Sequence, residues 1–218
     1  MIVLKWSIGA GAVLALLVGL WLFWPRAVGD VQDRAVVPLE AGKGVVVLGT
    51  SLSHKDWPKT LGGLCRSPVT QVTKPGANAY WGLEQVHKAI AAKPALVLVE
   101  FAINDADILD GLSKEESRQA LEQIITALEA GLPEAEVVLM TMNPVTGVTR
   151  LQRPFLAGYY GIVRDVADAR GLGLIDLEPR WQGALEVGEV IPDGVHPTRD
   201  SFARVALPAI AAALGCGD

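Results

Sequence analysis

The sequence predicts an α/β fold, a three-layer α/β/α flavodoxin-like sandwich with a parallel sheet, preceded by one N-terminal transmembrane helix. Short, uniformly apolar segments rich in valine and leucine indicate strands that are buried on both faces, as in a parallel sheet. Between them lie segments whose apolar residues follow helical spacing, which favours alternating strands and helices. A long uncharged stretch, from Trp6 to Trp24, precedes all of these segments.

Composition excludes several classes of protein. Of the 218 residues, 50% are hydrophobic and 20% are charged, which excludes a disordered chain. The formal net charge of -5 disfavours a nucleic-acid-binding surface. With two cysteines and three histidines, a disulfide-dense scaffold is excluded and an all-protein zinc site is disfavoured. Motifs for metal or nucleotide binding are lacking, so we expect no metal and no organic cofactor.

The first 26 residues predict a membrane anchor. The uncharged run from Trp6 to Trp24 is long enough, at about 1.5 Å per helical residue, to cross one bilayer core. Lys5 precedes the run and Arg26 follows it. We expect a single-pass protein of a bacterial-type inner membrane with its domain on the periplasmic or extracytoplasmic side. The alternative is secretion after cleavage of a signal peptide, because the small residues at 27–29 suit a cleavage site.

Residues 27–43 are punctuated by glycine and proline and predict a linker, and residues 44–218 predict one catalytic domain. Strands are expected at 45–48, 69–73, 95–101, 135–142 and 172–177, and helices at 57–64, 81–92, 113–130, 155–170 and 201–214. Ser113 and Glu116 have the spacing of a capping box at the start of the third helix. Gly131 and Gly171 follow the third and fourth helices as stop signals.

In folds of this class the chemistry gathers at the carboxyl ends of the strands. Ser51 follows the first strand after Gly49, in a tight turn where its hydroxyl suits a nucleophile. Gly76 and Asn104 follow the second and third strands, and a backbone N–H and a side-chain amide are suitable donors to an oxyanion. Each of these residues, taken alone, is also compatible with an ordinary turn or helix cap.

The loop before the last predicted helix contains Asp193 three residues before His196. At this spacing the carboxylate can bond one ring nitrogen, which leaves the other free to accept a proton from a serine. His54 is a second candidate base, but no acid is as well placed to orient it. His87 belongs to the helix at 81–92 and suits a surface position.

Taken in order, Ser51, Gly76, Asn104 and the Asp193–His196 pair resemble the SGNH hydrolases, the GDSL family of esterases and lipases. The resemblance extends from about residue 45 to 214. It implies Ser51, His196 and Asp193 as nucleophile, base and acid. It also implies an oxyanion hole made by the N–H groups of Ser51 and Gly76 and by the amide of Asn104.

Two positions depart from the family pattern. Thr50 stands where the family usually has the aspartate of its serine motif, and Ala102 stands where it has the glycine before the asparagine. Neither position is a reacting group, so the resemblance still implies ester hydrolysis through an acyl-enzyme. An acyltransferase with the same triad, and a catalytically silent binding or scaffold protein, are the alternatives.

The expected substrate is an ester of a short, acetyl-like acyl group on a cell-envelope glycan or lipid. The candidate residues for substrate binding are Asn143, Arg150 and Arg153, in the loop after the fourth strand, and Trp81 at the start of a helix. A pair of solvated arginines and a core tryptophan are the alternative interpretations. The chain is expected to contact the membrane through its N-terminal helix, and no nucleic acid is expected.

Cys65 follows the first predicted helix of the domain, and Cys216 follows the last one. In a flavodoxin-like strand order these two helices share a face of the sheet. We therefore expect a Cys65–Cys216 disulfide, which agrees with an exported domain. Two buried free cysteines are the alternative.

Overall fold

The computed structural model describes residues 27–54 and 56–216, and residues 13, 16, 17, 19 and 20 of the leader. Most of the predicted transmembrane stretch at 6–24 lies outside these residues. Within the described part of the chain, no helix combines the length and the apolar character needed to cross a bilayer.

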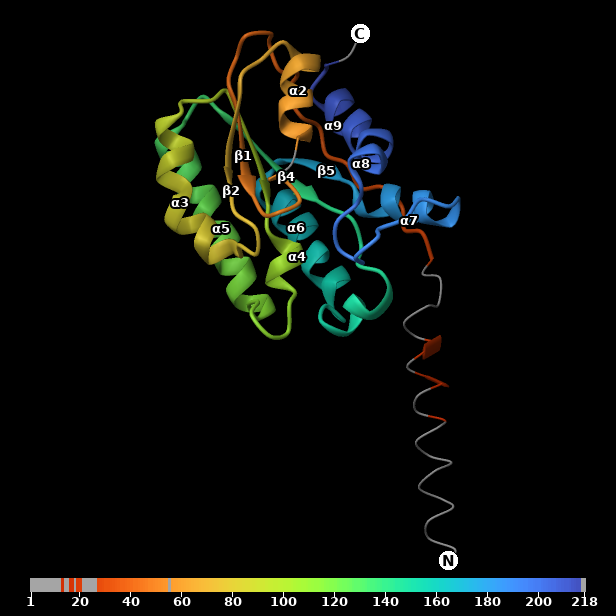
Figure 1. The fold of residues 1–218 in the computed structure, drawn as a ribbon. Helices are drawn as coiled ribbons and strands as arrows, with labels where there is room; N and C mark the ends of the chain where they lie inside the picture. Colours follow the sequence, from red (N-terminus) through yellow and green to blue (C-terminus); the bar gives the residue numbers. More distant parts are fainter. Residues whose placement is uncertain (1–12, 14–15, 18, 21–26, 55, 217–218) are drawn as a thin grey trace, which may run out of the picture.

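A parallel sheet of five strands forms the middle layer of the domain (Figure 1). The strands are β1 (Val45–Gly49), β2 (Val69–Thr73), β3 (Leu96–Glu100), β4 (Glu136–Thr141) and β5 (Gly173–Asp176), in the order β2-β1-β3-β4-β5. Every residue of β1, β3 and β5 is buried, whereas the edge strand β2 is partly exposed. The uniform apolar character of the inner strands follows from helices covering both faces of the sheet.

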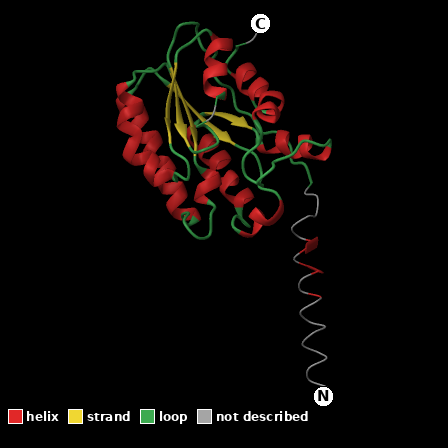
Figure 2. Ribbon diagram, in the orientation of Figure 1, coloured by secondary structure: helices red, strands yellow, loops and turns green. Residues whose placement is uncertain are grey.

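Two layers of helices cover the sheet, as Figure 2 shows. On one face α3 (Ala79–Ala91), α5 (Lys114–Gly131) and α6 (Leu156–Arg170) pack in sequence against one another. On the other face α2 (Trp57–Cys65) contacts α8 (Arg199–Val205) and α9 (Leu207–Ala213). The short elements α4 (Ala102–Asp105), η1 (Gly147–Leu151) and α7 (Glu178–Glu186) lie in the connections. The predicted three-layer α/β/α sandwich is thereby confirmed.

The prediction of a single helix at 201–214 is wrong, because the structure has two helices there, α8 and α9. The break falls at Ala206, and Pro208 occupies the first turn of α9. Proline has no N–H to donate and clashes with the preceding turn, so it is tolerated at the start of a helix and disfavoured inside one. The apolar spacing continues through the break, which is why the pattern indicated one helix.

The segment at 27–43, expected to be a linker, is fastened to the domain along the β5 edge of the sheet. Arg34 forms an isolated antiparallel bridge with Leu174, and its N–H donates to the Leu174 carbonyl at 3.0 Å. The N–H of Gln32 donates to the Asp176 carboxylate at 3.0 Å. A single bridge leaves no periodic pattern in the sequence, so it was not predicted.

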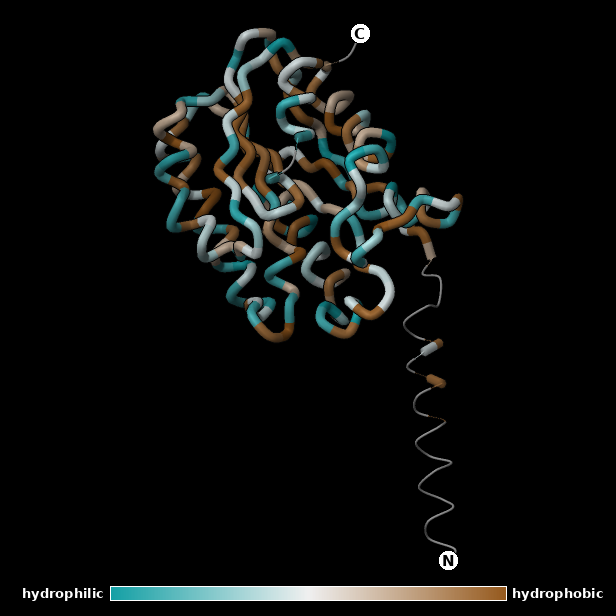
Figure 3. The backbone as a smooth tube through the Cα atoms, viewed as in Figure 1, coloured by the Kyte–Doolittle hydropathy of each residue, from teal (hydrophilic) through white to brown (hydrophobic). Residues whose placement is uncertain are grey.

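Apolar residues concentrate in the strands, whereas apolar and polar residues alternate along the helices (Figure 3). Cys65, at the end of α2, and Cys216, beyond α9, are joined by a disulfide bond. The bond connects segments 151 residues apart in sequence, and it fixes α2 to the C-terminal helices on the same face. The structure therefore contains the pairing that the expected strand order indicated.

Candidate active site

The carboxyl ends of three neighbouring strands bring the candidate residues to one edge of the sheet. Gly49, the last residue of β1, pairs in register with Thr73 of β2 and Glu100 of β3. The loops that follow these residues carry Ser51, Gly76 and Asn104, so they emerge side by side. Strand register alone therefore accounts for the convergence of three segments that are distant in sequence.

Ser51, His196 and Asp193 form one continuous chain of hydrogen bonds. Ser51 Oγ lies 2.8 Å from His196 Nε2, and His196 Nδ1 lies 2.7 Å from Asp193 Oδ2. The second carboxylate oxygen, Asp193 Oδ1, accepts the backbone N–H groups of Val195 at 2.9 Å and His196 at 2.6 Å. These backbone bonds lock the carboxylate in the orientation that faces the ring.

The same contacts keep Asp193 ionised. Partial burial acts to raise the pKa of Asp193, but the hydrogen bonds from the backbone and ring of His196 outweigh it and lower the pKa to about 2. A carboxylate that is charged at neutral pH can stabilise the imidazolium that forms when His196 takes a proton.

The candidate oxyanion donors have N–H groups that are available to a ligand. Among the hydrogen bonds of residues 27–54 and 56–216, none uses the backbone N–H of Ser51 or of Gly76 as donor. Gly76 has a φ of +74°, in the left-handed region that favours glycine. Asn104 donates one amide hydrogen from Nδ2 to the Ala77 carbonyl at 2.9 Å, and its second amide hydrogen is left for a ligand. This bond holds α4 against the turn that contains Gly76.

The turn that carries Ser51 rests on a buried carboxylate that the sequence interpretation missed. Glu100 accepts the Thr50 N–H at 2.6 Å, and the Thr50 hydroxyl lies 3.0 Å from each of its carboxylate oxygens. Threonine suits this position because its hydroxyl can donate, whereas an ionised aspartate cannot. The only signal in the sequence was a glutamate that ends an otherwise apolar strand.

Burial of Glu100 raises its pKa to about 7, against the lowering effect of the Thr50 N–H and of the nearby Ser53 and Thr50 hydroxyls. The folded protein therefore holds this proton more tightly than the unfolded chain, whose glutamate has a pKa near 4.5. Protons are released more readily from the unfolded state, so the free energy of unfolding falls as pH rises from about 4.5 to about 7.

Glu100→Gln removes this titration, and the variant should gain about 3 kcal/mol in unfolding free energy relative to the wild type as pH rises from 4.5 to above 7. Urea unfolding of both proteins at pH 5, 6, 7 and 8 measures the difference. Glu84→Gln, on the exposed face of α3, is the matched control and should show no such trend. Parallel pH curves for wild type and Glu100→Gln would contradict a raised pKa at Glu100.

The two other histidines do not pair with Ser51. His54 Nδ1 lies 2.9 Å from the Thr73 hydroxyl, and His87 Nδ1 lies 2.9 Å from the Glu84 carbonyl. Both rings are on exposed residues. His196 is the histidine whose ring meets the serine.

Two of the candidate substrate-binding residues have structural roles instead. Asn143 is fully buried and donates from Nδ2 to the Val195 carbonyl at 2.7 Å, so it holds the loop of His196 and is not exposed to a substrate. Arg153 pairs with Asp107 at 3.0 Å and donates to the Ile103 carbonyl at 2.8 Å. The side chain of Arg153 is only 11% exposed, so it joins two loops and does not face solvent.

The other two candidates are more accessible. Arg150, in η1, is partly exposed, and its Nε donates to the Val145 carbonyl at 3.3 Å. Trp81 is half-buried in the first turn of α3, and Lys74 Nζ lies 6.0 Å from the centre of its ring. Ala102, where the family usually has glycine, is buried at the start of α4.

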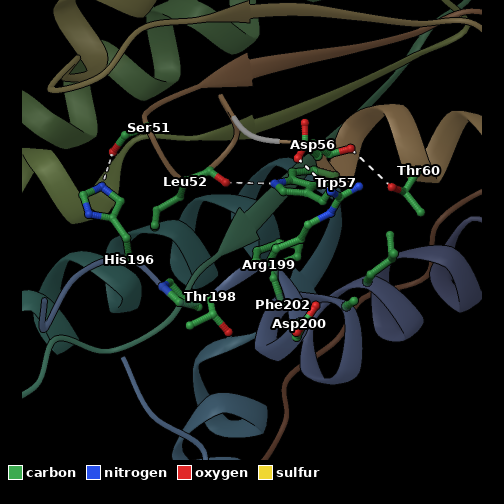
Figure 4. A pocket seen from close by; sticks show the side chains of 13 residues that line it. Ser51, Leu52, Asp56, Trp57, Thr60, His196, Thr198, Arg199, Asp200 and Phe202 are labelled. Carbon is green, nitrogen blue, oxygen red and sulfur yellow. Dashed lines mark hydrogen bonds and ion pairs between the residues drawn. The ribbon is translucent and has the colours of Figure 1, made fainter. Parts of the chain in front are cut away.

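A pocket of about 490 Å³ opens beside Ser51 and His196, between α2 and α8 (Figure 4). Its apolar lining comes from Leu52, Trp57, Phe202 and Leu207. The sequence did not indicate it, because its two walls are helices far apart in the chain whose spacing predicts only burial. Within the part of the chain that the structure describes, no group of three or more histidine, cysteine or acidic residues is arranged to hold a metal ion.

A sequence model of the GDSL-like lipase/acylhydrolase family matches residues 40–203. A GDSL esterase/lipase of Arabidopsis thaliana is 26% identical over an alignment of 137 residues, and the match covers 56% of this chain and 57% of the plant protein. The match thus spans little more than half the length of that relative.

Several solved structures share the fold. Axe2, an acetylxylan esterase from Geobacillus stearothermophilus, has a TM-score of 0.71 at 16% identity, over 81% of this chain and 95% of its own. The α/β hydrolase LAE5 from the metagenome of Lake Arreo in Spain has a TM-score of 0.70 at 18% identity, over 83% and 98%. A lipase/acylhydrolase from Enterococcus faecalis has a TM-score of 0.64 at 21% identity, over 80% and 97%.

Proposed function

The chain belongs to the GDSL-like lipase/acylhydrolase family, and we propose that it hydrolyses carboxylic esters with Ser51 as nucleophile, His196 as general base and Asp193 as the acid that orients it. The observation that carries this proposal is the unbroken path of hydrogen bonds from Ser51 Oγ through the His196 ring to Asp193. A hydroxyl, an imidazole and a carboxylate in this order are what a serine acyl-transfer reaction requires.

The reaction proceeds in two steps. His196 Nε2 takes the proton of Ser51 as Oγ attacks the ester carbonyl, and the new oxyanion accepts hydrogen bonds from the N–H groups of Ser51 and Gly76 and from the amide of Asn104. His196 then gives the proton to the leaving alcohol, and the acyl group remains on Ser51 as an ester. In the second step His196 activates a water molecule, which releases the acid and restores the serine.

The substrate that we propose is a short, acetyl-like ester on a cell-envelope glycan or lipid. One fold neighbour is itself an acetylxylan esterase, which supports a short acyl group on a glycan. The uncharged segment from Trp6 to Trp24 supports attachment to an inner membrane with the domain outside the cytoplasm. The Cys65–Cys216 disulfide supports the same compartment, because such bonds persist in oxidising environments.

Labelling with a fluorophosphonate tests the proposal directly, because these reagents phosphonylate serines that an adjacent histidine activates. The full-length protein, in detergent, should be labelled at a single tryptic peptide that contains Ser51. Thermally unfolded protein is the control and should not react. A folded wild-type protein that is not labelled would contradict the proposed acyl-transfer function.

A further inference from the structure

We infer that the pocket between α2 and α8 binds the alcohol half of the ester, and that this alcohol is a sugar unit. The inference rests on the proposed function, because only an ester substrate has an alcohol half that this pocket could bind. At about 490 Å³ the pocket is within the range of 300–1,000 Å³ that is typical of small-molecule sites. It is much larger than a methyl or ethyl group needs.

The geometry of the tetrahedral intermediate decides which half of the ester enters the pocket. The carbon bonded to Ser51 Oγ carries an oxyanion, a leaving oxygen and the acyl substituent. The oxyanion points to Gly76 and Asn104, neither of which lines the pocket. The leaving oxygen must approach His196 Nε2 to receive its proton. His196 does line the pocket, together with the residues that follow it in the chain.

The leaving alcohol therefore lies over His196 and extends into the pocket. Figure 4 shows Ser51 and His196 at one end, with Trp57, Thr60 and Asp56 at the other. A group that is bonded to the leaving oxygen therefore extends from the His196 end of the pocket toward the Trp57 end, away from the reacting carbon. The acyl substituent, the third group on the carbon, is directed away from both the oxyanion donors and the histidine.

The floor of the pocket is apolar and held in place. The rings of Trp57 and Phe202 stack with their centres 5.2 Å apart. The indole N–H of Trp57 donates to the Leu52 carbonyl at 2.8 Å. Because the indole N–H has a partner and the ring is packed, the aromatic floor is preorganised for a ligand.

The rim has the opposite character. Asp56, Thr60, Thr198, Arg199 and Asp200 line the pocket and are exposed. Arg199 and Asp56 form an ion pair at 3.4 Å from opposite walls. A plain alkyl chain would add no hydrogen bond to these groups, whereas a sugar presents C–H groups to the floor and hydroxyls to the rim. An apolar surface with a few polar groups that fix orientation is how such a site achieves specificity.

Ala203→Trp tests the inference, because Ala203 is an exposed residue of α8 that lines the pocket, so a larger side chain would fill it. Two esters separate the halves of the substrate. Glucose 6-acetate has a large alcohol and a small acyl group, and ethyl hexanoate has the reverse. Hydrolysis of either ester releases a carboxylic acid, and titrating this acid with base at constant pH gives the rate and hence kcat/KM for each ester. Ala91→Trp, at the exposed end of α3 on the other face of the sheet, is the matched control.

We expect Ala203→Trp to lower kcat/KM for glucose 6-acetate by about tenfold or more, and to change the value for ethyl hexanoate by less than about twofold. Ala91→Trp should leave both values unchanged. A loss confined to ethyl hexanoate, an equal loss for both esters, or no loss for either would overturn the assignment. A wild-type enzyme that reacts with fluorophosphonate yet does not hydrolyse glucose 6-acetate would overturn it too. A wild type that does not react would instead refute the proposed function.

Discussion

Ser51→Ala should lower kcat/KM for a short-chain ester by about four to six orders of magnitude. The alanine cannot form the covalent acyl-enzyme, so the two-step path is closed. What remains is the slower attack of water on an ester held by the oxyanion donors, which is why the loss is large but finite. Hydrolysis of an acetate ester by wild type and variant, at matched protein concentration, measures it.

Ser53→Ala is the matched control, because Ser53 lies in the same turn and its buried hydroxyl has no bond to His196. This variant should retain activity within a few-fold of the wild type. Far-ultraviolet circular dichroism should show the Ser51→Ala variant folded, because Ser51 Oγ is bonded only to the His196 ring, and the same measurement on Ser53→Ala checks the control. Wild-type activity in Ser51→Ala would remove Ser51 from the mechanism and leave the proposed function without its nucleophile.

Much of the fold could be predicted because its strands are buried on both faces. Burial of this kind requires apolar residues at every position, and the segments that form β1, β3 and β4 satisfy it. The errors arise where tertiary structure acts without a repeating pattern. The bridge between Arg34 and Leu174 occupies a single pair of residues, and the break before α9 depends on Pro208 in a segment whose apolar spacing does not change.

The site also contains residues that could be predicted from the sequence and residues that could not. The chain of hydrogen bonds through His196 joins residues that stand in recognisable local settings, a tight turn after a strand and an acid three residues from a histidine. Asn143 and Arg153 also lie in the connection that follows β4, but the structure turns both inward to hold loops. Position after a strand therefore indicates proximity to the site and leaves the direction of the side chain undetermined. Glu100 went unnoticed because its role depends on the fold around Thr50.

Asp193→Asn should lower kcat/KM by about four orders of magnitude, through the tautomer of His196. The backbone N–H groups of Val195 and His196 donate to Asp193 Oδ1, so in the variant the amide oxygen will keep this place. The amide nitrogen then faces His196 Nδ1 and donates to it. The ring must carry its proton on Nε2, where it can donate to Ser51 and can no longer accept the serine proton.

The comparison with Asp193→Ala separates this cause from simple loss of charge. Alanine leaves Nδ1 without a partner, and the ring can still take the productive tautomer for part of the time, so its loss should not exceed that of the asparagine variant. Asp110→Asn removes an exposed carboxylate elsewhere and should leave kcat/KM unchanged. A clearly smaller loss for asparagine than for alanine would show that Asp193 acts by bulk or polarity alone. The locked carboxylate would then contribute to the loop and not to the chemistry.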